Sequence, residues 1–359
     1  MLTRIRCHKI WWPCLIWAVL SLQTISAATG GAIAQTRAVV DGAGRTVQVP
    51  ERIGRVLAAG PPASVLLYTL APELMVGWVR EPPPDEKAYL AAPYRDMPAH
   101  GRLTGRGNTA NIESIIALKP DLIIDVGSTD ATYVSLAERV QQQTGIPYLL
   151  LDGTIGKTAE TYRIFGKIVG REDRAESLAR YSEATMHGIR QRIDPIPVER
   201  RPSVYYGRGP RGLETGLAGS INLEVLEAVG ARNAAAAGGR GGLTTVSLEQ
   251  ILGWNPDIIL ALEPAFYRDV VHNPLWSGIK AVRERRIYRT PSLPYGWFDS
   301  PPGANRLIGM RWLAAILYPD VITEDLRQAT RDYYSQFYHV QLSDSLLDAL
   351  LRDATSPPP

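Results

Sequence analysis

Helical and strand-like hydrophobic patterns alternate along this chain, and one such unit occurs twice. Residues 111–125 read NIESIIALKPDLIID, and residues 247–261 read SLEQILGWNPDIILA. Each copy begins with a helix-capping residue, places a glutamate in the first turn, and then spaces apolar residues along one helical face. A Pro-Asp pair ends that pattern, and a short aliphatic run typical of a buried parallel strand follows. We therefore predict the same helix and strand in both halves.

A second unit precedes each copy. In the first half the pattern predicts a strand at 55–59, a helix at 64–70 and a strand at 74–78. In the second half it predicts a strand at 203–206, a helix at 222–229 and the start of a strand at 231–233. Strands that alternate with helices indicate parallel sheets with covered faces. The predicted fold class is α/β, with two Rossmann-like lobes at 35–153 and 195–359 and a helical segment at 154–194 between them.

The segment between the lobes contains one long predicted helix. Apolar residues recur at helical spacing from Glu172 to Ile193, and Pro195 and Pro197 end the pattern. A helix of about 20 residues covers roughly 30 Å, which is enough to run from one lobe to the other. An ordinary crossover helix inside one sheet fits the same periodicity, so the pattern leaves both interpretations open.

The N-terminus reads as a secretory signal peptide. Three cations, Arg4, Arg6 and Lys9, precede an apolar stretch at 10–22, and small residues around 32–34 fit a cleavage site. We expect a mature periplasmic protein that begins near Gln35. Both cysteines, at 7 and 14, lie in the removed segment, and the residues before the second do not form a lipid-attachment signal. We therefore predict no disulfide and no lipid anchor.

Charge excludes one class of partner. The chain has 39 Lys and Arg against 36 Asp and Glu, and all three surplus cations are in the signal segment. A mature protein of near-zero net charge without a basic tail is unlike a nucleic-acid-binding protein, which needs clustered cations at phosphates. We also find no nucleophile elbow, metal triad or paired acid and base, so the sequence predicts binding rather than catalysis.

The candidate ligand residues follow predicted strands, because ligands of doubly wound sheets bind beyond the carboxyl ends of the strands. Arginine pairs with oxyanions and aromatic rings stack on planar groups, so these loops suit a bulky, partly anionic and partly flat ligand. Arg208 is the best single cation. The mature chain has no close histidine pair, which leaves His100 and His272 as weak metal candidates. The predicted ligand contacts are Ser64, Arg80, Tyr206, Arg208, Arg240, Tyr295 and Trp297.

Five segments carry a family resemblance: DGAGRTVQVPERIGRVLA at 41–58, the two copies of Glu-x-Ile-(x)4-Pro-Asp, GREDRAESLARY at 170–181 between those copies, and DYYSQFYHVQLSD at 332–344. Together they resemble the class III periplasmic binding proteins for ferric siderophores, haem and cobalamin, whose two lobes are joined by one long helix. The resemblance covers nearly the whole mature chain. It implies a monomer without a cofactor of its own, which captures an iron chelate or related metal complex and delivers it to an ABC permease and its ATPase.

The resemblance also implies that Glu113 and Glu249, one in each repeat copy, meet arginines of the permease. A helix-dipole role, worth a few tenths to about 1 kcal/mol, explains the same two glutamates. Three other functions stay open: a receptor for an oxyanion, a receptor for a free transition metal, and a metallocofactor enzyme on a similar two-lobed framework.

Overall fold

The computed structural model describes residues 35–105 and 107–355, and residues 36–359 form one compact unit. The predicted signal peptide therefore lies outside the described residues. None of the helices in the described part combines the length and the apolar character that crossing a membrane requires.

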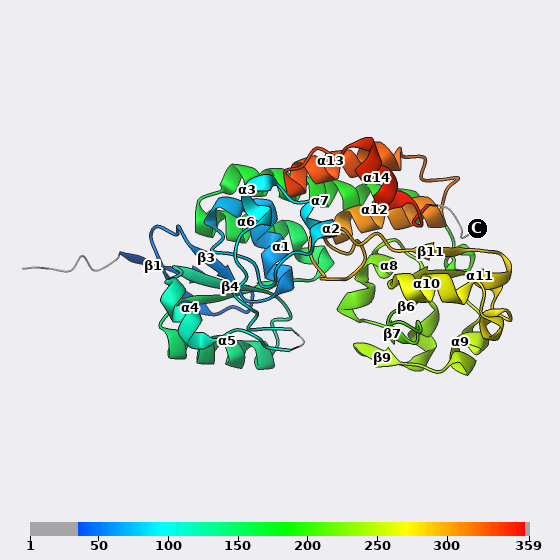
Figure 1. Ribbon diagram of the computed structural model, residues 1–359, viewed down its shortest axis with the longest axis horizontal. Coiled ribbons are helices and arrows are strands. Elements are labelled where there is room, and N and C mark those ends of the chain that lie inside the picture. Colours follow the sequence, from blue (N-terminus) through cyan, green and yellow to red (C-terminus); the bar gives the residue numbers. More distant parts are fainter. Residues whose placement is uncertain (1–34, 106, 356–359) are drawn as a thin grey trace, which may run out of the picture. The chain divides into compact units, whose positions relative to one another are not determined.

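The N-terminal lobe is built on a parallel sheet in the order β3 (Val56–Ala58), β4 (Leu122–Gly127), β5 (Tyr148–Asp152). Its strands are almost wholly buried, as expected for a sheet covered on both faces. The covering helices include α1 (Pro61–Leu70), α4 (Ile112–Leu118) and α5 (Ala131–Thr144) (Figure 1). A hairpin of β1 (Thr36–Val40) and β2 (Thr46–Pro50) precedes the sheet.

The strand predicted at 74–78 is not a regular strand. Residues Pro72–Leu74 form a 3-10 turn, and Met75 then makes a single bridge with Val56 of β3. Three residues later the backbone N–H of Trp78 donates to the Pro98 carbonyl, so the chain pairs with 98–100 instead. The prediction was wrong because the aliphatic pattern records burial, not which backbone is the partner.

The C-terminal lobe has a second parallel sheet, in the order β11 (Ile287–Arg289), β10 (Ile258–Ala261), β6 (Ser203–Gly207), β8 (Arg232–Asn233). A short antiparallel pair, β7 (Glu214–Gly216) and β9 (Leu243–Thr245), lies beside it. The predicted helix at 222–229 is a 3-10 turn, Ile221–Leu223, followed by α8 (Glu224–Ala228). Two further short helices of this lobe are α10 (Pro264–Val270) and α11 (Lys280–Arg283). The N-terminal half has two short helices as well, α2 (Pro84–Lys87) and α3 (Ala92–Arg95). The α/β fold with two parallel sheets is confirmed.

The sequence repeat is a structural repeat. Helices α4 and α9 (Leu248–Trp254) have the same length, and each is capped by the side chain of its first repeat residue, Asn111 or Ser247. Both end in a left-handed residue, Lys119 or Asn255, before the buried strand. The burial classes of residues 111–120 and 247–256 are identical position by position.

The long helix predicted at 172–193 is confirmed as α7, Glu172–Ile193. It packs against α1 and α6 (Thr158–Val169) on the N-terminal side and against α12 (Arg306–Leu317) on the C-terminal side (Figure 1). Helix α7 therefore joins the two lobes, and the crossover interpretation is wrong.

The last helices return to the first lobe. Helix α13 (Leu326–Tyr338) packs on α1, and α14 (Asp344–Leu351) packs on α13. Their interface is aromatic: Tyr68 of α1 stacks near Tyr338, and its hydroxyl donates to the Tyr338 carbonyl over 2.6 Å. The C-terminal helices thus complete the core of the N-terminal lobe as well as that of their own.

Candidate ligand-binding cleft

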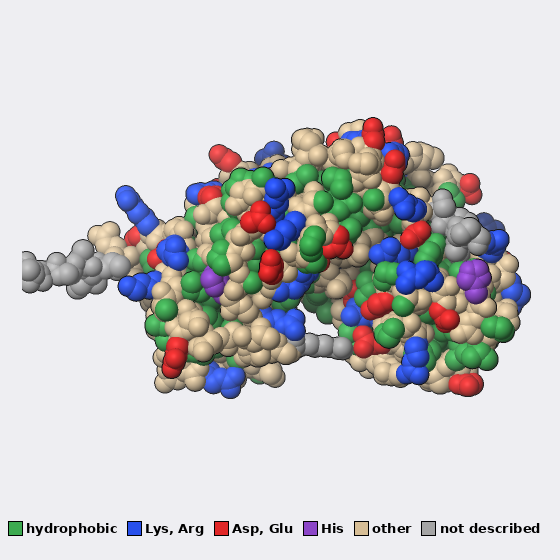
Figure 2. Space-filling model, in the orientation of Figure 1, with side chains coloured by type: hydrophobic (Ala, Val, Ile, Leu, Met, Phe, Trp, Pro, Cys, Tyr) green, Lys and Arg blue, Asp and Glu red, His purple; other side chains and the backbone are tan. Residues whose placement is uncertain are grey.

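The main cavity of the described residues is a cleft of about 840 Å³ with walls from both lobes. Segments that follow β3, β4, β5 and β6 line it, which is where parallel sheets bind ligands. The loop before α12 and the turn before α8 also contribute. Figure 2 shows this face of the 36–359 unit hollowed between the two lobes. The predicted residues divide into those that line this cleft and those that do not.

Two predicted contacts, Ser64 and Tyr295, line the cleft with unused hydrogen-bonding groups. Both side chains are more than nine-tenths buried, and neither hydroxyl has a hydrogen-bond partner. Burial raises the pKa of Tyr295 well above its ordinary value, so the phenol stays protonated. A buried hydroxyl without a partner costs free energy that a ligand acceptor can recover. These two groups are available donors.

Arg208 lines the cleft but is held by two carboxylates. Its Nε donates to Glu214 over 3.0 Å, and Nη1 forms a close ion pair with Asp299. Asp299 is buried and also accepts from Asn222 Nδ2 at 2.9 Å. Arg208 therefore lines the cleft, but two internal acids already pair with its charge, and its contact with a ligand stays a prediction.

Tyr206 and Trp297 do not line the cleft. Tyr206 is fully buried, its ring packs on Phe298 at a centroid distance of 4.2 Å, and its hydroxyl donates to Asp299 over 2.6 Å. Trp297 is likewise fully buried, and its indole N–H points to the Tyr334 hydroxyl. Both aromatics support the cleft wall from behind, which corrects their prediction as ligand contacts.

The other arginines considered differ in whether they line the cleft and whether a carboxylate pairs with them. Arg80 lines the cleft, and its Nη2 donates to both carboxylate oxygens of Glu86 at 2.7 and 2.8 Å. Arg240 is exposed and does not line the cleft, although its backbone bridges Ala218 beside the lining residue Gly219. Arg102, which the sequence did not single out, lines the cleft, and among the described residues it has no carboxylate partner.

The N-terminal wall contains a buried acid at the end of β4. Asp125 accepts hydrogen bonds from the Thr104 hydroxyl at 3.1 Å, the Tyr148 hydroxyl at 3.2 Å and the Val126 backbone at 3.0 Å. Burial raises the pKa of Asp125 above its ordinary value despite these three donors. Asp125 thus adds a buried carboxyl group to a cleft wall that also carries Arg80 and Arg102.

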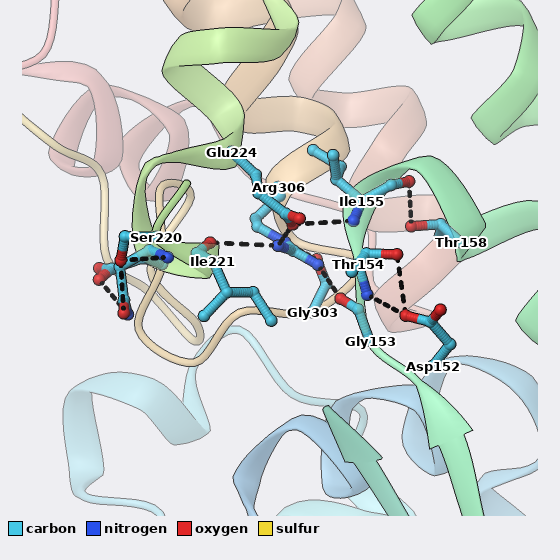
Figure 3. Close-up of polar contacts among 12 residues, drawn as sticks. Asp152, Gly153, Thr154, Ile155, Thr158, Ser220, Ile221, Glu224, Gly303 and Arg306 are labelled. Carbon is cyan, nitrogen blue, oxygen red and sulfur yellow. Dashed lines mark hydrogen bonds and ion pairs between the residues drawn. The ribbon is translucent and has the colours of Figure 1, made fainter. Parts of the chain in front are cut away.

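A buried ion pair crosses the floor of the cleft (Figure 3). Arg306 of α12 pairs with Glu224 of α8 at 2.5 Å, and its other terminal nitrogen donates to the Gly153 carbonyl after β5. The same Glu224 oxygen accepts from the Ile155 backbone at 2.8 Å. Arg306 is 1% exposed, and its burial lowers its pKa. The two lobes are therefore tied together beneath the site.

The histidine candidates lie elsewhere. His100 is half-buried with its Nε2 3.1 Å from the Val76 carbonyl, and His272 is exposed after α10; neither lines the cleft. Within 35–105 and 107–355, no three His, Cys, Asp or Glu side chains are grouped to hold a metal ion. The two weak metal candidates are thus not brought together.

Sequence reasoning missed several residues of the site. Asp299, Asn222, Arg102, Asp125 and Glu224 all line the cleft. Asp125 ends a predicted strand, and a charged residue within an aliphatic run was the signal that could have identified it. Glu224 and Asn222 bond to Arg306 and Asp299, which are 82 and 77 residues away, so no local pattern marks these contacts. Glu113 and Glu249 are exposed on α4 and α9, outside the cleft.

Known proteins share this architecture. An ABC transporter solute-binding protein from Sulfurospirillum deleyianum superposes with a TM-score of 0.80 at 27% identity, over 88% of this chain and 99% of that one. The molybdate-binding protein MolA of Haemophilus influenzae is 25% identical over 84% of this chain and 91% of its own. The iron-uptake system-binding protein of Bacillus subtilis is 24% identical over 54% of this chain and 62% of its own.

The periplasmic binding protein family matches residues 83–294, which include both copies of the repeat, the long helix and most of the cleft. With two parallel sheets, one joining helix and a cleft at the strand ends, the chain belongs to the periplasmic binding protein family.

Proposed function

We propose that this protein is the periplasmic capture component of an ABC importer and that its ligand is a bulky, oxygen-rich metal chelate: a siderophore, haem or related complex. The observation that carries the proposal is the cleft of about 840 Å³ lined by both lobes. Sites that enclose organic ligands have volumes of roughly 300–1,000 Å³. The relative that takes part in iron uptake supports the same ligand class.

The lining chemistry fits such a ligand. The hydroxyls of Ser64 and Tyr295 and the guanidinium of Arg102 supply donors for chelate oxygens. Trp78 and Tyr133 supply aromatic surface in the same cleft. A chelate offers both acceptor oxygens and flat or apolar faces, so these groups complement it without any catalytic step.

The second candidate is an oxyanion such as molybdate, favoured by the similarity to MolA. Two features of the cleft weigh against it. An oxyanion of five atoms occupies only a small part of the volume, and two of the three described lining arginines already pair with carboxylates. We do not extend the proposal to a free transition metal, because the described cleft lining contains neither histidine nor cysteine.

The ligand class is tested by titrating the purified mature protein while following tryptophan fluorescence, because Trp78 lines the cleft. The probes are a ferric catecholate, a ferric hydroxamate, haemin, cyanocobalamin, molybdate and tungstate. We expect at least one chelate to bind with a Kd below about 1 µM, or roughly −8 kcal/mol. Binding of molybdate in that range with no response to any chelate would reverse the order of the two candidates.

Delivery and location complete the proposal. We propose that the protein is exported by the segment before Gln35, is not lipid-anchored, acts as a monomer, and docks on the permease through Glu113 and Glu249. Both glutamates are exposed, and neither has an ion-pair partner among the described residues. The pKa of Glu249 is lowered by its own backbone N–H and by Ser247, which keeps it ionised.

A further inference from the structure

The repeat exposes an aliphatic side chain at the same position in both lobes. Ile116 of α4 and Leu252 of α9 each lie five residues after the helix cap, and their exposed fractions are 43% and 37%. Only seven large hydrophobic residues are exposed in the described part of the chain. Single exposed apolar residues are ordinary. Two exposed aliphatic residues at equivalent repeat positions, on helices of different lobes, indicate a shared role.

Each aliphatic residue belongs to a small surface of the same composition, which we call the repeat patch: residues 113, 116 and 117 on α4, and 249, 252 and 253 on α9. The glutamate precedes the aliphatic residue by three positions, so both lie on one helix face. The next residue is small and exposed, Ala117 or Gly253. The neighbour on the other side, Ile115 or Ile251, is buried and holds the helix on its sheet.

More than half of each aliphatic residue is covered by its own lobe, where Leu252 lies beside Gly278, and the rest is exposed. Successive helix positions are about 100° apart, so Ile115 and Ile251 fill the core while Ile116 and Leu252 turn outward. An outward aliphatic beside an unpaired carboxylate and a small residue offers a partner one apolar contact, one charge and room for close approach. A partner that fits both repeat patches needs two equivalent surfaces, each with a cation next to an apolar hollow.

We propose that Ile116 and Leu252 are contact residues for the permease, which receives the two repeat patches on two equivalent surfaces of its own. This inference rests on the proposed function and adds an apolar component to the docking glutamates. The two components have different physics. The carboxylates steer association and respond to salt, whereas the aliphatic contacts exclude water and are nearly insensitive to salt.

The test measures binding of the ligand-free mature protein to the permease and ATPase complex of the same bacterium in lipid nanodiscs. Replacing either Ile116 or Leu252 by Ser is expected to weaken binding about three- to tenfold, from the apolar area that each loses. The two sites are far apart in the chain and independent, so Ile116→Ser with Leu252→Ser should weaken binding about 10- to 100-fold. Thermal unfolding of each variant is measured in parallel, so that a loss of binding can be compared with any loss of stability.

The matched control is Val198→Ser with Val321→Ser, two exposed aliphatic residues outside the repeat. This variant should bind as the unmodified protein does. A second arm varies salt: Glu113→Gln with Glu249→Gln should flatten the salt dependence of binding, while the aliphatic double variant should keep its slope.

The possible results distinguish a failure of the apolar contact from a failure of the delivery role. Unchanged binding by the Ile116 and Leu252 double variant would overturn this inference and leave the proposed function intact. Equal losses in the Val198 and Val321 control would also overturn it, because the effect would not belong to the repeat. If the unmodified protein does not bind the complex at all, the proposed delivery role fails, and this inference fails with it.

Discussion

At the residue scale, the predicted cation of the cleft is already paired with acids, whereas two predicted hydroxyl contacts have no hydrogen-bond partner. Arg208 is neutralised by Asp299 and Glu214, whereas the buried hydroxyls of Ser64 and Tyr295 have no partners. An unsatisfied buried donor destabilises the empty protein and gains its hydrogen bond only when the ligand supplies an acceptor. The hydrogen bonds of these two hydroxyls therefore contribute to ligand affinity and not to the stability of the empty protein.

Tyr295→Phe should lower ligand affinity without lowering stability. The variant loses a donor to the ligand, worth about 0.5–1.5 kcal/mol or roughly two- to twelvefold in Kd. The free energy of unfolding of the empty protein should stay equal or rise, because the removed hydroxyl has no partner. The measurements are urea unfolding of the empty protein and fluorescence titration with the tightest-binding chelate of the screen.

Tyr318→Phe is the matched control for that variant. The Tyr318 hydroxyl is also buried without a partner, but it does not line the cleft. Its affinity should equal that of the unmodified protein. A Tyr295→Phe variant with unaltered affinity, or with the same small change as Tyr318→Phe, would remove the Tyr295 hydroxyl from the ligand contacts.

At the element scale, α8, α12 and the turn after β5 are tied by one buried charge pair. Arg306 and Glu224 satisfy each other, and both also bond to backbone groups of 153–155. A buried pair of this kind contributes little compared with apolar residues of the same shape, but removing one partner leaves an unpaired charge in the core. The pair thus determines the relative orientation of α8, α12 and the turn after β5, and it contributes little to the free energy of unfolding.

Glu224→Ala should reduce the free energy of unfolding by about 3–5 kcal/mol because it strands the Arg306 guanidinium. Replacing both residues, with Glu224→Leu and Arg306→Met, should restore much of that loss. The control is Glu160→Ala, which breaks an exposed pair with Lys157 and should leave the free energy of unfolding nearly unchanged. Urea unfolding measures all three, and a double variant no more stable than Glu224→Ala would contradict the explanation.

Elements with strong local patterns were predictable and the cleft floor was not. The bounds of α7 and both repeat helices follow from periodicity, capping residues and Pro-Asp stops within the segment itself. Tyr206 and Tyr295 show the limit of that reasoning. Both are tyrosines near strand ends, but Tyr206 is within a strand buried on both faces and Tyr295 is in a loop that reaches the cleft. Only the fold separates them.

At the scale of the whole molecule, the largest of three hydrophobic clusters in the described residues spans both lobes, and each lobe also has a smaller cluster of its own. A single cluster contains Val56 and Leu122 of the first sheet and Val204 and Ile258 of the second. Helices α1, α7, α12 and α13 connect these residues through their buried side chains. The lobes are therefore distinct in topology but continuous in packing.

Residues 36–355 should unfold in one cooperative transition, although chains of this size commonly show intermediates. Scanning calorimetry of the ligand-free mature protein should give equal calorimetric and van't Hoff enthalpies. A fragment that ends before α7 should lack the cover over α1 and remain unfolded by far-UV circular dichroism. Two resolved calorimetric transitions, or a folded fragment, would show that the lobes are independent.

The return of α13 to α1 has a consequence for how the protein is made. Tyr68 is separated by 270 residues from Tyr338, whose carbonyl accepts its hydroxyl. At about 5–20 residues per second, a ribosome needs roughly 15–50 s to add that length. Throughout this interval the first lobe lacks the cover that α13 provides over α1. The core of the first lobe is therefore completed only after the last helices of the chain have been synthesised.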